Sequence, residues 1–517
     1  MIKKADEIKL IVQPIFLTFH HEYVFEGPCR WGSGEALTKE FDLMVDAQRL
    51  ENLTAEAKEH LDDVVDLRDV IYIDRTEEFL ITDEDLDKMC ANSDEVDVYL
   101  INPMNRCTDL VIPFAQRVRK PIVITPDALP MQAIMTAAVR ARDITEINCF
   151  RTWDETLEFL DVMRVRKALA TSKVLLAARF GTTRSISGMD NFVDLETVTE
   201  TLGTQFCFVN PHELLDQSHI CEDDTNPTTP GRHGLNPTPE EVEEMNRLTD
   251  ELMDGAEECD MNRDDVFSSV RAFMTNKKFC EHYGCNAFTA PCPDLCATRR
   301  LNEERYTFCL THSLLGEQGI PSACEYDISA VLSMLVLSSF MHKPAYMGNT
   351  TYDPKQWADA GEVKINVMMN DVGSTDYKKL VMEDDPENTF ITWHSVAKRN
   401  MKGFDTEKVK YALRPFASSG FGATLRVEFT EDAGTPITML RFDPSCRKLF
   451  VAKGEIVAGR GYADKGCSLG MFFKVADGKD FYAKQLTFGN HIPLVYGDCF
   501  DKACKLGELL GLEVVTA

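Results

Sequence analysis

The sequence predicts an α/β protein: two doubly wound, Rossmann-like parallel-sheet domains, followed by a C-terminal β-rich, barrel-like domain. Up to about residue 345, short apolar runs alternate with longer amphipathic stretches, as in strands joined by helices. Beyond that point, strand-like runs follow one another and glycines separate several of them. A chain of 517 residues has room for two to four domains, and we place them at 1–170, 171–345 and 346–517.

The first domain is predicted from apolar runs that fit buried strands. The expected strands are 8–13, 69–74, 96–102 and 121–125, and the expected helices are 36–62, 107–118 and 127–142. Strands that alternate with helices imply a parallel sheet covered on both faces. No GxGxxG motif follows any of these strands, so a dinucleotide site is not indicated.

The second domain repeats this pattern. Its expected strands are 173–180, 205–210 and 286–291, with helices at 303–316 and directly after Asp327. The Pro-, Thr- and Gly-rich stretch 221–240 predicts a surface loop, and Thr238-Pro239-Glu240-Glu241 predicts a capped helix start.

The third domain is predicted from strand-like runs without long helical stretches between them. The expected strands are 363–369, 389–394, 424–430, 436–442, 448–459 and 470–476, and a terminal helix is expected at about 498–511. This succession of short strands is typical of an antiparallel sheet or barrel.

Charge and hydropathy make some classes of binding partner unfavourable. The net charge of -29 disfavours nucleic acid and anionic membrane surfaces as partners. The N-terminus lacks the apolar core of a signal peptide, and the longest apolar stretch, 330–341, is too short to cross a bilayer. We therefore expect a cytoplasmic protein without a membrane partner.

The 17 cysteines show no framework spacing, so we expect reduced thiols. One close set, Cys280, Cys285, Cys292 and Cys296, leaves a zinc or iron–sulfur site as the alternative to buried thiols. Its gaps match no CxxC pair, which favours thiols.

Two carboxylates begin the most apolar helix. Glu325 and Asp327 precede the run from Ile328 onward, and the positive end of a helix holds such groups ionised, where they can face a cation or a substrate. Capping of a core helix is the simpler explanation, and it accounts for one acid better than for two.

Four segments occur in the order and spacing found in the L-fucose isomerase family: CEYDISAVLSML, GNTTY, SSGFGATLRVEFTEDAGTPITMLRF and FGNHIPLVYGD. The chain resembles this family over about residues 280–500. The resemblance implies a Mn²⁺ site, with Mg²⁺ or Co²⁺ as substitutes, held by Glu325, Asn349 and His491. It also implies catalysis by Glu325, with Asp327 as a further catalytic candidate, and a homo-oligomer, hexamer or trimer. Asn349 stands where the family has an acid, and an amide cannot act as a general base.

Four further residues are candidates for contacting substrate: His394 at a strand end, Arg184 and Arg300 in loops, and Asn490 beside His491. His312 is expected to be structural. Weaker candidates are His20 and His21 near the first strand, and Asp353 as a substitute for the missing acid.

The function that the resemblance implies is a metal-dependent aldose–ketose isomerase acting on a small sugar, which includes deoxy- and sulfo-sugars, through an enediol. The alternatives are a lyase or epimerase on the same scaffold, or a sugar-binding protein without catalysis.

Overall fold

The chain folds into two compact units in a computed structural model: Lys9–Arg164, and Val165–Ala517 together with Met1–Ile8. The structure describes residues 2–18, 20, 39–61, 63–74, 82–103, 108–128, 131–142, 144, 147–221, 234–297, 299–351, 385 and 387–517. Asp353, His21 and the strand expected at 363–369 lie outside these residues.

The unit Lys9–Arg164 is built on a parallel sheet. Its strand order is β2-β1-β4-β5-β6, and β3 also pairs with β1. The strands are β1 (Leu10–Thr18), β2 (Val65–Leu67), β3 (Ile71–Asp74), β4 (Val98–Pro103), β5 (Ile122–Ile124) and β6 (Ile147–Cys149). The helices are α1 (Lys39–Leu61), α2 (Asp83–Met89), α3 (Thr108–Val118), α4 (Met131–Arg140) and α5 (Trp153–Thr171), the last continuing into the other unit.

Helices cover both faces of this sheet. Side chains alternate between the two faces along each strand, so neighbouring residues of β4 enter different cores. Tyr99 and Ile101 of β4 belong to a core that includes residues of α2, α3 and α4. Val98 and Leu100 belong to a second core, with residues of α1 and α5. The predicted parallel sheet is therefore confirmed for this unit.

The second unit contains a smaller parallel sheet, of order β11-β10-β7-β8. Its strands are β7 (Lys173–Leu176), β8 (Gln205–Phe208), β10 (Ala287–Thr289) and β11 (Ser322–Ala323). The helices are α6 (Leu195–Leu202), α7 (Pro211–Asp216), α8 (Pro239–Asp254), α9 (Arg263–Tyr283), α10 (Cys292–Ala297), α11 (Arg300–Glu304), α12 (Cys309–Glu317) and α13 (Ile328–Met341). Thr238 and Glu241 form the predicted capping box at the start of α8.

The prediction of a single helix at 303–316 is wrong. Two helices, α11 and α12, occupy this stretch, because Arg305 has a left-handed backbone with φ 58° and ends α11. The amphipathic pattern is continuous across the break, so the pattern alone could not show it.

The C-terminal part is a seven-stranded sheet, of order β12-β13-β18-β17-β16-β19, with β20 parallel to β17 and the other pairs antiparallel. Its strands are β12 (Asn349–Thr351), β13 (Thr389–Trp393), β16 (Pro436–Phe442), β17 (Lys448–Arg460), β18 (Gly470–Lys474), β19 (Leu494–Tyr496) and β20 (Glu513–Thr516). A small sheet of β9 (Glu258–Cys259), β14 (Ala412–Pro415) and β15 (Ala423–Arg426) lies apart. Two helices complete this part, α16 (Gly478–Gln485) and the expected terminal helix α17 (Phe500–Leu509).

The predicted antiparallel sheet is confirmed, but the expected barrel is not found among the described residues. The strand path is open and ends at β12 and β19. Near these ends, two isolated bridges pair Tyr346 with Leu494 and Asn349 with His491. A closed barrel would need a continuous ladder of paired residues here. The second bridge places two of the candidate ligands side by side.

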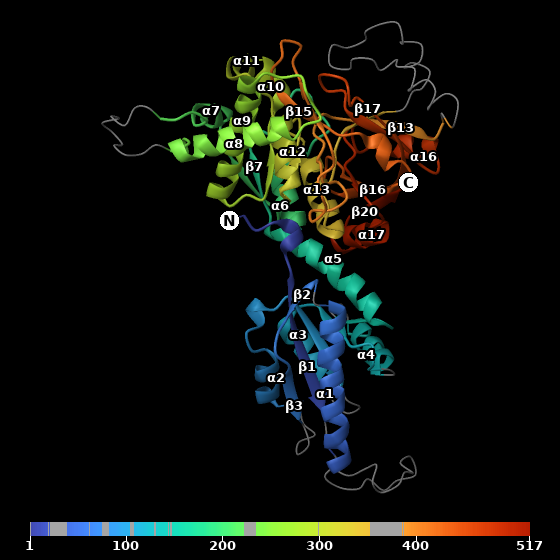
Figure 1. Ribbon diagram of the computed structural model, residues 1–517. Helices are drawn as coiled ribbons and strands as arrows, with labels where there is room; N and C mark the ends of the chain where they lie inside the picture. The colour runs from blue at the N-terminus through green and yellow to red at the C-terminus, as the bar shows by residue number, and fades with distance from the viewer. Residues whose placement is uncertain are drawn as a thin grey trace. The chain divides into compact units, whose positions relative to one another are not determined.

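Helix α13 connects the two larger sheets of this unit. It packs against β10 and β11 of the parallel sheet and against β16 and β19 of the antiparallel sheet, and Figure 1 shows it in yellow. Its side chains are buried from Ile328 to Phe340. The residues just before α13 are therefore held where the two sheets meet.

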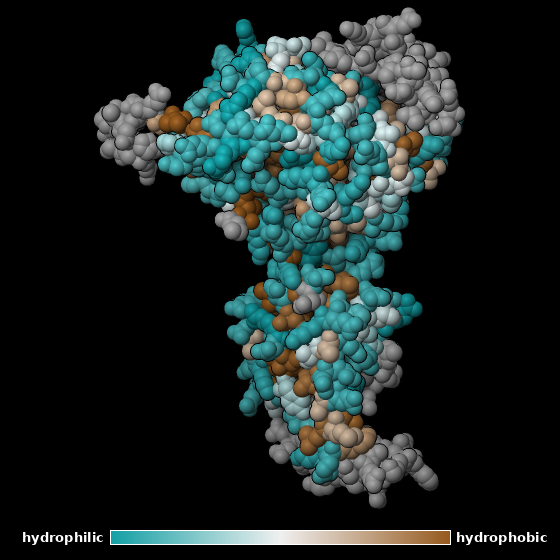
Figure 2. Space-filling view, viewed as in Figure 1, coloured by the Kyte–Doolittle hydropathy of each residue, from teal (hydrophilic) through white to brown (hydrophobic). Residues whose placement is uncertain are grey.

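The visible face of each unit is largely hydrophilic in Figure 2, in keeping with the ordinary content of charged residues, 27%. Among the described residues, no helix is both long and apolar enough to span a membrane.

Candidate functional site

The turn before α13 has an unusual backbone. Glu325 and Tyr326 have φ values of 59° and 61°, a left-handed conformation that is rare for residues other than glycine. Ser185 Oγ donates to the Glu325 carbonyl at 2.8 Å, and Asn191 Nδ2 donates to the Tyr326 carbonyl at 2.7 Å. Such conformations persist where surrounding contacts hold them, and they concentrate at functional sites.

Asp327 caps α13 and organises the residues behind the turn. Its Oδ1 accepts from the Ala330 backbone N–H at 2.8 Å. Its Oδ2 accepts from Arg441 Nη1 at 2.7 Å and lies 2.8 Å from His491 Nδ1. Burial alone would raise the pKa of Asp327, but the Arg441 guanidinium and the His491 hydrogen bond outweigh it and hold the pKa well below its usual range. Asp327 is thus an ionised, fully engaged carboxylate.

The segment that carries His491 is fixed where three segments of the chain approach one another closely. Gly489 has φ 140°, and a Cβ there would come within 2.7 Å of Arg441 Nε and also meet Asp190 Oδ2. Asp190 Oδ2 accepts from the Asn490 backbone N–H at 2.7 Å. Only glycine fits this position, which explains the Gly-Asn-His turn.

Four side chains meet in front of the turn: Glu325, Asn349, His394 and His491, here called the Glu325 group. His394 Nε2 lies 3.6 Å from Glu325 Oε1 and 3.2 Å from His491 Nε2. His491 Nε2 lies 3.9 Å from Glu325 Oε2. Asn349 Nδ2 lies 3.2 Å from His394 Nε2, and its Oδ1 accepts from Asn490 Nδ2. The predicted ligands Glu325, Asn349 and His491 are therefore neighbours, and His394 joins them.

Burial shapes the electrostatics of this group. Burial raises the pKa of Glu325, while the neighbouring His491 lowers it in part. Burial, followed by the charge of His491, lowers the pKa of His394 well below its usual value, so His394 is a neutral imidazole. Burial also opposes protonation of His491, but the contact with Asp327 outweighs it and raises the pKa of His491.

The donor set fits a divalent cation. Bonds of about 2.1–2.2 Å to one ion separate neighbouring donors by roughly 3.0–3.6 Å, close to the separations of 3.2, 3.6 and 3.9 Å. Asp327 binds Nδ1 of His491 and leaves Nε2 facing Glu325, the arrangement that orients metal-binding histidines. The structure therefore contains side chains that could hold a metal ion. Cys324, Glu325 and His394 form a further group whose ligand atoms are close enough to share one ion.

Other predicted residues lie elsewhere. Arg300 is on α11 and pairs with Asp216 at 3.1 Å, apart from the Glu325 group. Arg184 is exposed, in the segment next to Ser185. His20 belongs to the unit Lys9–Arg164, where it is buried 2.8 Å from Asp46.

The four cysteines of the close set form no common ligand group among the described residues. Cys280 and Cys285 are buried, Cys296 is exposed, and Cys292 lies beside Cys324, with 3.7 Å between the sulfur atoms. His312, expected to be structural, has Nε2 3.8 Å from Cys292 Sγ. The pairing of Cys292 with Cys324 and His312 was missed because the three residues are 32 and 20 positions apart on different elements.

Arg441 was also missed, although it is fully buried. An arginine inside the otherwise apolar run PITMLRF was the available signal, because a buried guanidinium requires a carboxylate or carbonyl partner.

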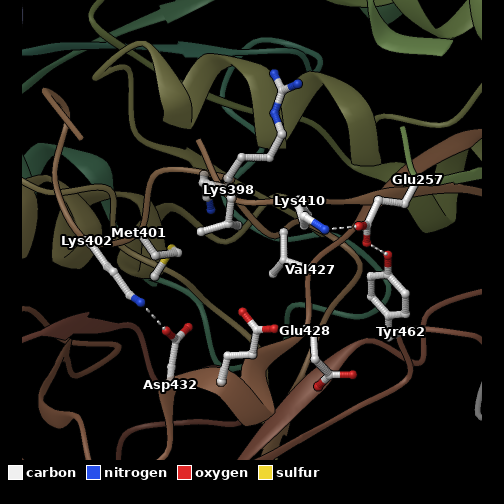
Figure 3. A pocket seen from close by; sticks show the side chains of 12 residues that line it. Glu257, Lys398, Met401, Lys402, Lys410, Val427, Glu428, Asp432 and Tyr462 are labelled. Carbon is white, nitrogen blue, oxygen red and sulfur yellow. Dashed lines mark hydrogen bonds and ion pairs between the residues drawn. The ribbon is translucent and has the colours of Figure 1, made fainter. Parts of the chain in front are cut away.

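A separate cavity has a volume of about 290 Å³. Figure 3 shows its lining, in which Lys402 pairs with Asp432 at 3.1 Å and Lys410 pairs with Glu257 at 2.6 Å. Lys398, on the same wall, is fully buried. Two ion pairs thus join lining residues to one another, and the cavity shares no lining residue with the Glu325 group.

Comparison with known proteins assigns no family: no protein-family model matches the chain, and no curated protein matches it.

Proposed function

We propose that this chain is a metal-dependent aldose–ketose isomerase that acts on a small sugar, deoxy- and sulfo-sugars included, through an enediol. The observation that supports it most is the convergence of Glu325, His394 and His491, with donor atoms 3.2–3.9 Å apart. The order of the four sequence segments that resemble the L-fucose isomerase family supports the same reaction class.

The proposed metal is Mn²⁺, with Mg²⁺ or Co²⁺ as substitutes. Glu325, His394 and His491 would hold it, and Asn349 would add its amide oxygen after the amide turns, since Oδ1 now faces Asn490. Oxygen and imidazole donors suit these ions. When bound, the metal would polarise the substrate carbonyl and the adjacent hydroxyl.

Proton transfer falls to Glu325. In an aldose, it would take the proton from C2 and return it to C1, while the hydroxyl proton passes from O2 to O1, so that no atom is gained or lost. Asp327 cannot share this task while the Ala330 backbone N–H occupies its Oδ1 and Arg441 and His491 occupy its Oδ2, and we assign it a positioning role.

A second candidate is a lyase or epimerase on the same scaffold. The observation that favours it is Asn349, which leaves Glu325 as the only carboxylate of the Glu325 group. A reaction that needs one base, such as cleavage next to a carbonyl, would suit this set.

The two candidates are separated by turnover in D₂O. Full-length protein loaded with Mn²⁺ is incubated with a panel of aldoses and ketoses, and the products are analysed by NMR. An isomerase gives the partner aldose or ketose with deuterium on a former C–H carbon, whereas a lyase gives shorter carbon chains. If the loaded protein converts no member of a panel that includes deoxy- and sulfo-sugars, the isomerase proposal is rejected.

Asn349→Asp adds a further test. The added carboxylate should tighten Mn²⁺ because it restores one negative charge. Unchanged or higher isomerase turnover supports an isomerase pocket, whereas loss of turnover with tighter metal supports the second candidate.

A further inference from the structure

A second set of potential ligands lies behind the Glu325 group: Cys292, His312 and Cys324, here called the Cys292 group. Cys292 is the first residue of α10, His312 lies on α12, and Cys324 follows β11. The two sulfur atoms and one ring nitrogen all lie within 4.8 Å of one another. Three elements distant in sequence thus bring two thiols and an imidazole to one point.

The separations match those of a tetrahedral metal site. Zn–S bonds of about 2.3 Å place two sulfurs about 3.8 Å apart, and Zn–S with Zn–N bonds places sulfur and nitrogen about 3.5 Å apart. Here Sγ–Sγ is 3.7 Å, and Cys292 Sγ lies 3.8 Å from His312 Nε2. The third separation, from Cys324 Sγ to the His312 ring nitrogen, is within 4.8 Å.

The imidazole is already oriented for this task. His312 Nδ1 lies 2.7 Å from Ser322 Oγ, which leaves Nε2 toward the thiols, as second-shell partners do for metal-binding histidines. The rings of Phe288 and Phe308 lie 5.9 and 6.3 Å from the His312 ring. His312 is fully buried and Cys324 is 6% exposed, so these two donors are shielded from bulk water, whereas Cys292 is half-buried.

We propose that the Cys292 group is a binding site for a thiolate-preferring divalent cation, Zn²⁺ by its chemistry. Binding converts two thiols and Zn²⁺ into two zinc–thiolate bonds and releases two protons, with no change of oxidation state. Three protein ligands leave the fourth position to water or to another group. Mn²⁺ prefers oxygen donors, so the two groups would select different ions.

This site does not depend on the isomerase proposal. Cys324 lies between the two groups, since its sulfur is also within 4.8 Å of donor atoms of Glu325 and His394. Cys292 and His312 belong only to the second group, and substitutions there separate the two ion sites.

Co²⁺ binding to the reduced full-length chain tests the site, because thiolate–cobalt charge-transfer absorption reports sulfur ligands directly. We expect one Zn²⁺ per chain to displace the cobalt absorption, and Cys292→Ser to reduce that absorption by half. Ser322→Ala should weaken Zn²⁺ binding roughly 10–100-fold, the usual effect of losing a second-shell partner. Cys504→Ser, at a half-buried thiol of α17, is the matched control and should change neither value.

Alkylation of the unmodified protein keeps the test decisive if a variant fails to fold. Zn²⁺ should protect Cys292 from a thiol reagent and leave Cys504 equally reactive. His491→Ala should lose Mn²⁺ yet keep the thiolate–cobalt absorption, so failure of one site is distinguishable from failure of the other. The proposal is overturned if reduced protein binds no Zn²⁺, or if Cys292→Ser leaves the absorption unchanged.

Discussion

Glu325 and Asp327 are two residues apart, yet their carboxylates have different surroundings. Asp327 is fully buried and bound to Arg441 and His491, which hold its pKa well below the usual range. The Glu325 side chain is 17% exposed, and burial raises its pKa. Carboxylates whose environments push their pKa values apart commonly take different roles, here positioning for Asp327 and proton transfer for Glu325.

Two substitutions at Glu325 separate metal binding from proton transfer. Glu325→Gln keeps an oxygen donor but cannot accept a proton, so turnover should fall roughly 10²–10⁴-fold while Mn²⁺ remains. Glu325→Ala should lose the metal as well. Steady-state rates and metal content check both, and full activity of Glu325→Gln would rule out this role.

Lys398 gives a prediction on stability and pH. Its Nζ has no hydrogen-bond partner among the described residues and lies 5.8 Å from the Tyr346 ring. Burial lowers the pKa of Lys398 to about 7, although Glu317 opposes the shift. The unfolded chain therefore binds a proton that the folded chain rejects between the unfolded pKa of 10.5 and about 7, and stability is lost as the pH falls through this range.

Lys398→Met should remove this cost. We expect a gain in unfolding free energy of a few kcal/mol, about 5 at most, at and below neutral pH. The gain should shrink as the pH rises toward 10.5. Denaturant unfolding at several pH values measures it, and a gain independent of pH would show that packing, not the buried amine, is responsible.

At the scale of elements, the Gly489–His491 turn determines whether His491 reaches Glu325. Gly489→Ala would force a Cβ against Arg441 and Asp190 in addition to straining the backbone. We expect a loss of about 2–4 kcal/mol in stability and weaker Mn²⁺ binding. Gly420→Ala is the control, because Gly420 also has a positive φ, 98°, but an added Cβ meets nothing within 4 Å. Equal losses in thermal unfolding would show that the close approach is unimportant.

Local signals predicted many of the elements. The Thr238 capping box and the terminal helix α17 formed where expected, because each depends on neighbouring residues. The break between α11 and α12 was missed because it depends on one left-handed residue, Arg305. The open path of the C-terminal sheet was missed because closure depends on which strands pair with one another. The order and composition of strand-like runs in the sequence do not determine this pairing.

The candidate site was predictable only in part for the same reason. Glu325 and His491 stood in recognisable segments, whereas the 3.2 Å approach of His394 to His491 spans 97 positions. The partners Arg441 and Cys292 are likewise defined by folding rather than by local pattern.

For the whole molecule, we expect a homo-oligomer, a hexamer or trimer, as the family resemblance implies. Phe180, Ile186 and Met189 are 89%, 74% and 68% exposed, in the same segment as Ser185, which contacts the Glu325 backbone. Exposed apolar side chains within one short segment are candidates for an interface, and a net charge of -29 makes association without such contacts unfavourable.

Sedimentation velocity tests this expectation. Met189→Asp should shift the protein toward smaller species, whereas Leu486→Asp, at a residue 66% exposed on a different segment, should not. A wild-type chain that sediments only as a monomer at micromolar concentration would exclude the oligomer.

The most direct test of the proposed metal centre is Mn²⁺ binding to the full-length chain, measured by electron paramagnetic resonance. We predict one tightly bound ion per chain, and at least about a tenfold loss of affinity in both His394→Ala and His491→Ala. His282→Ala, at an exposed residue of α9, should bind as the wild type does. Equal Mn²⁺ affinity in all four proteins would contradict the assignment of His394 and His491 as ligands, and with it the metal-dependent function.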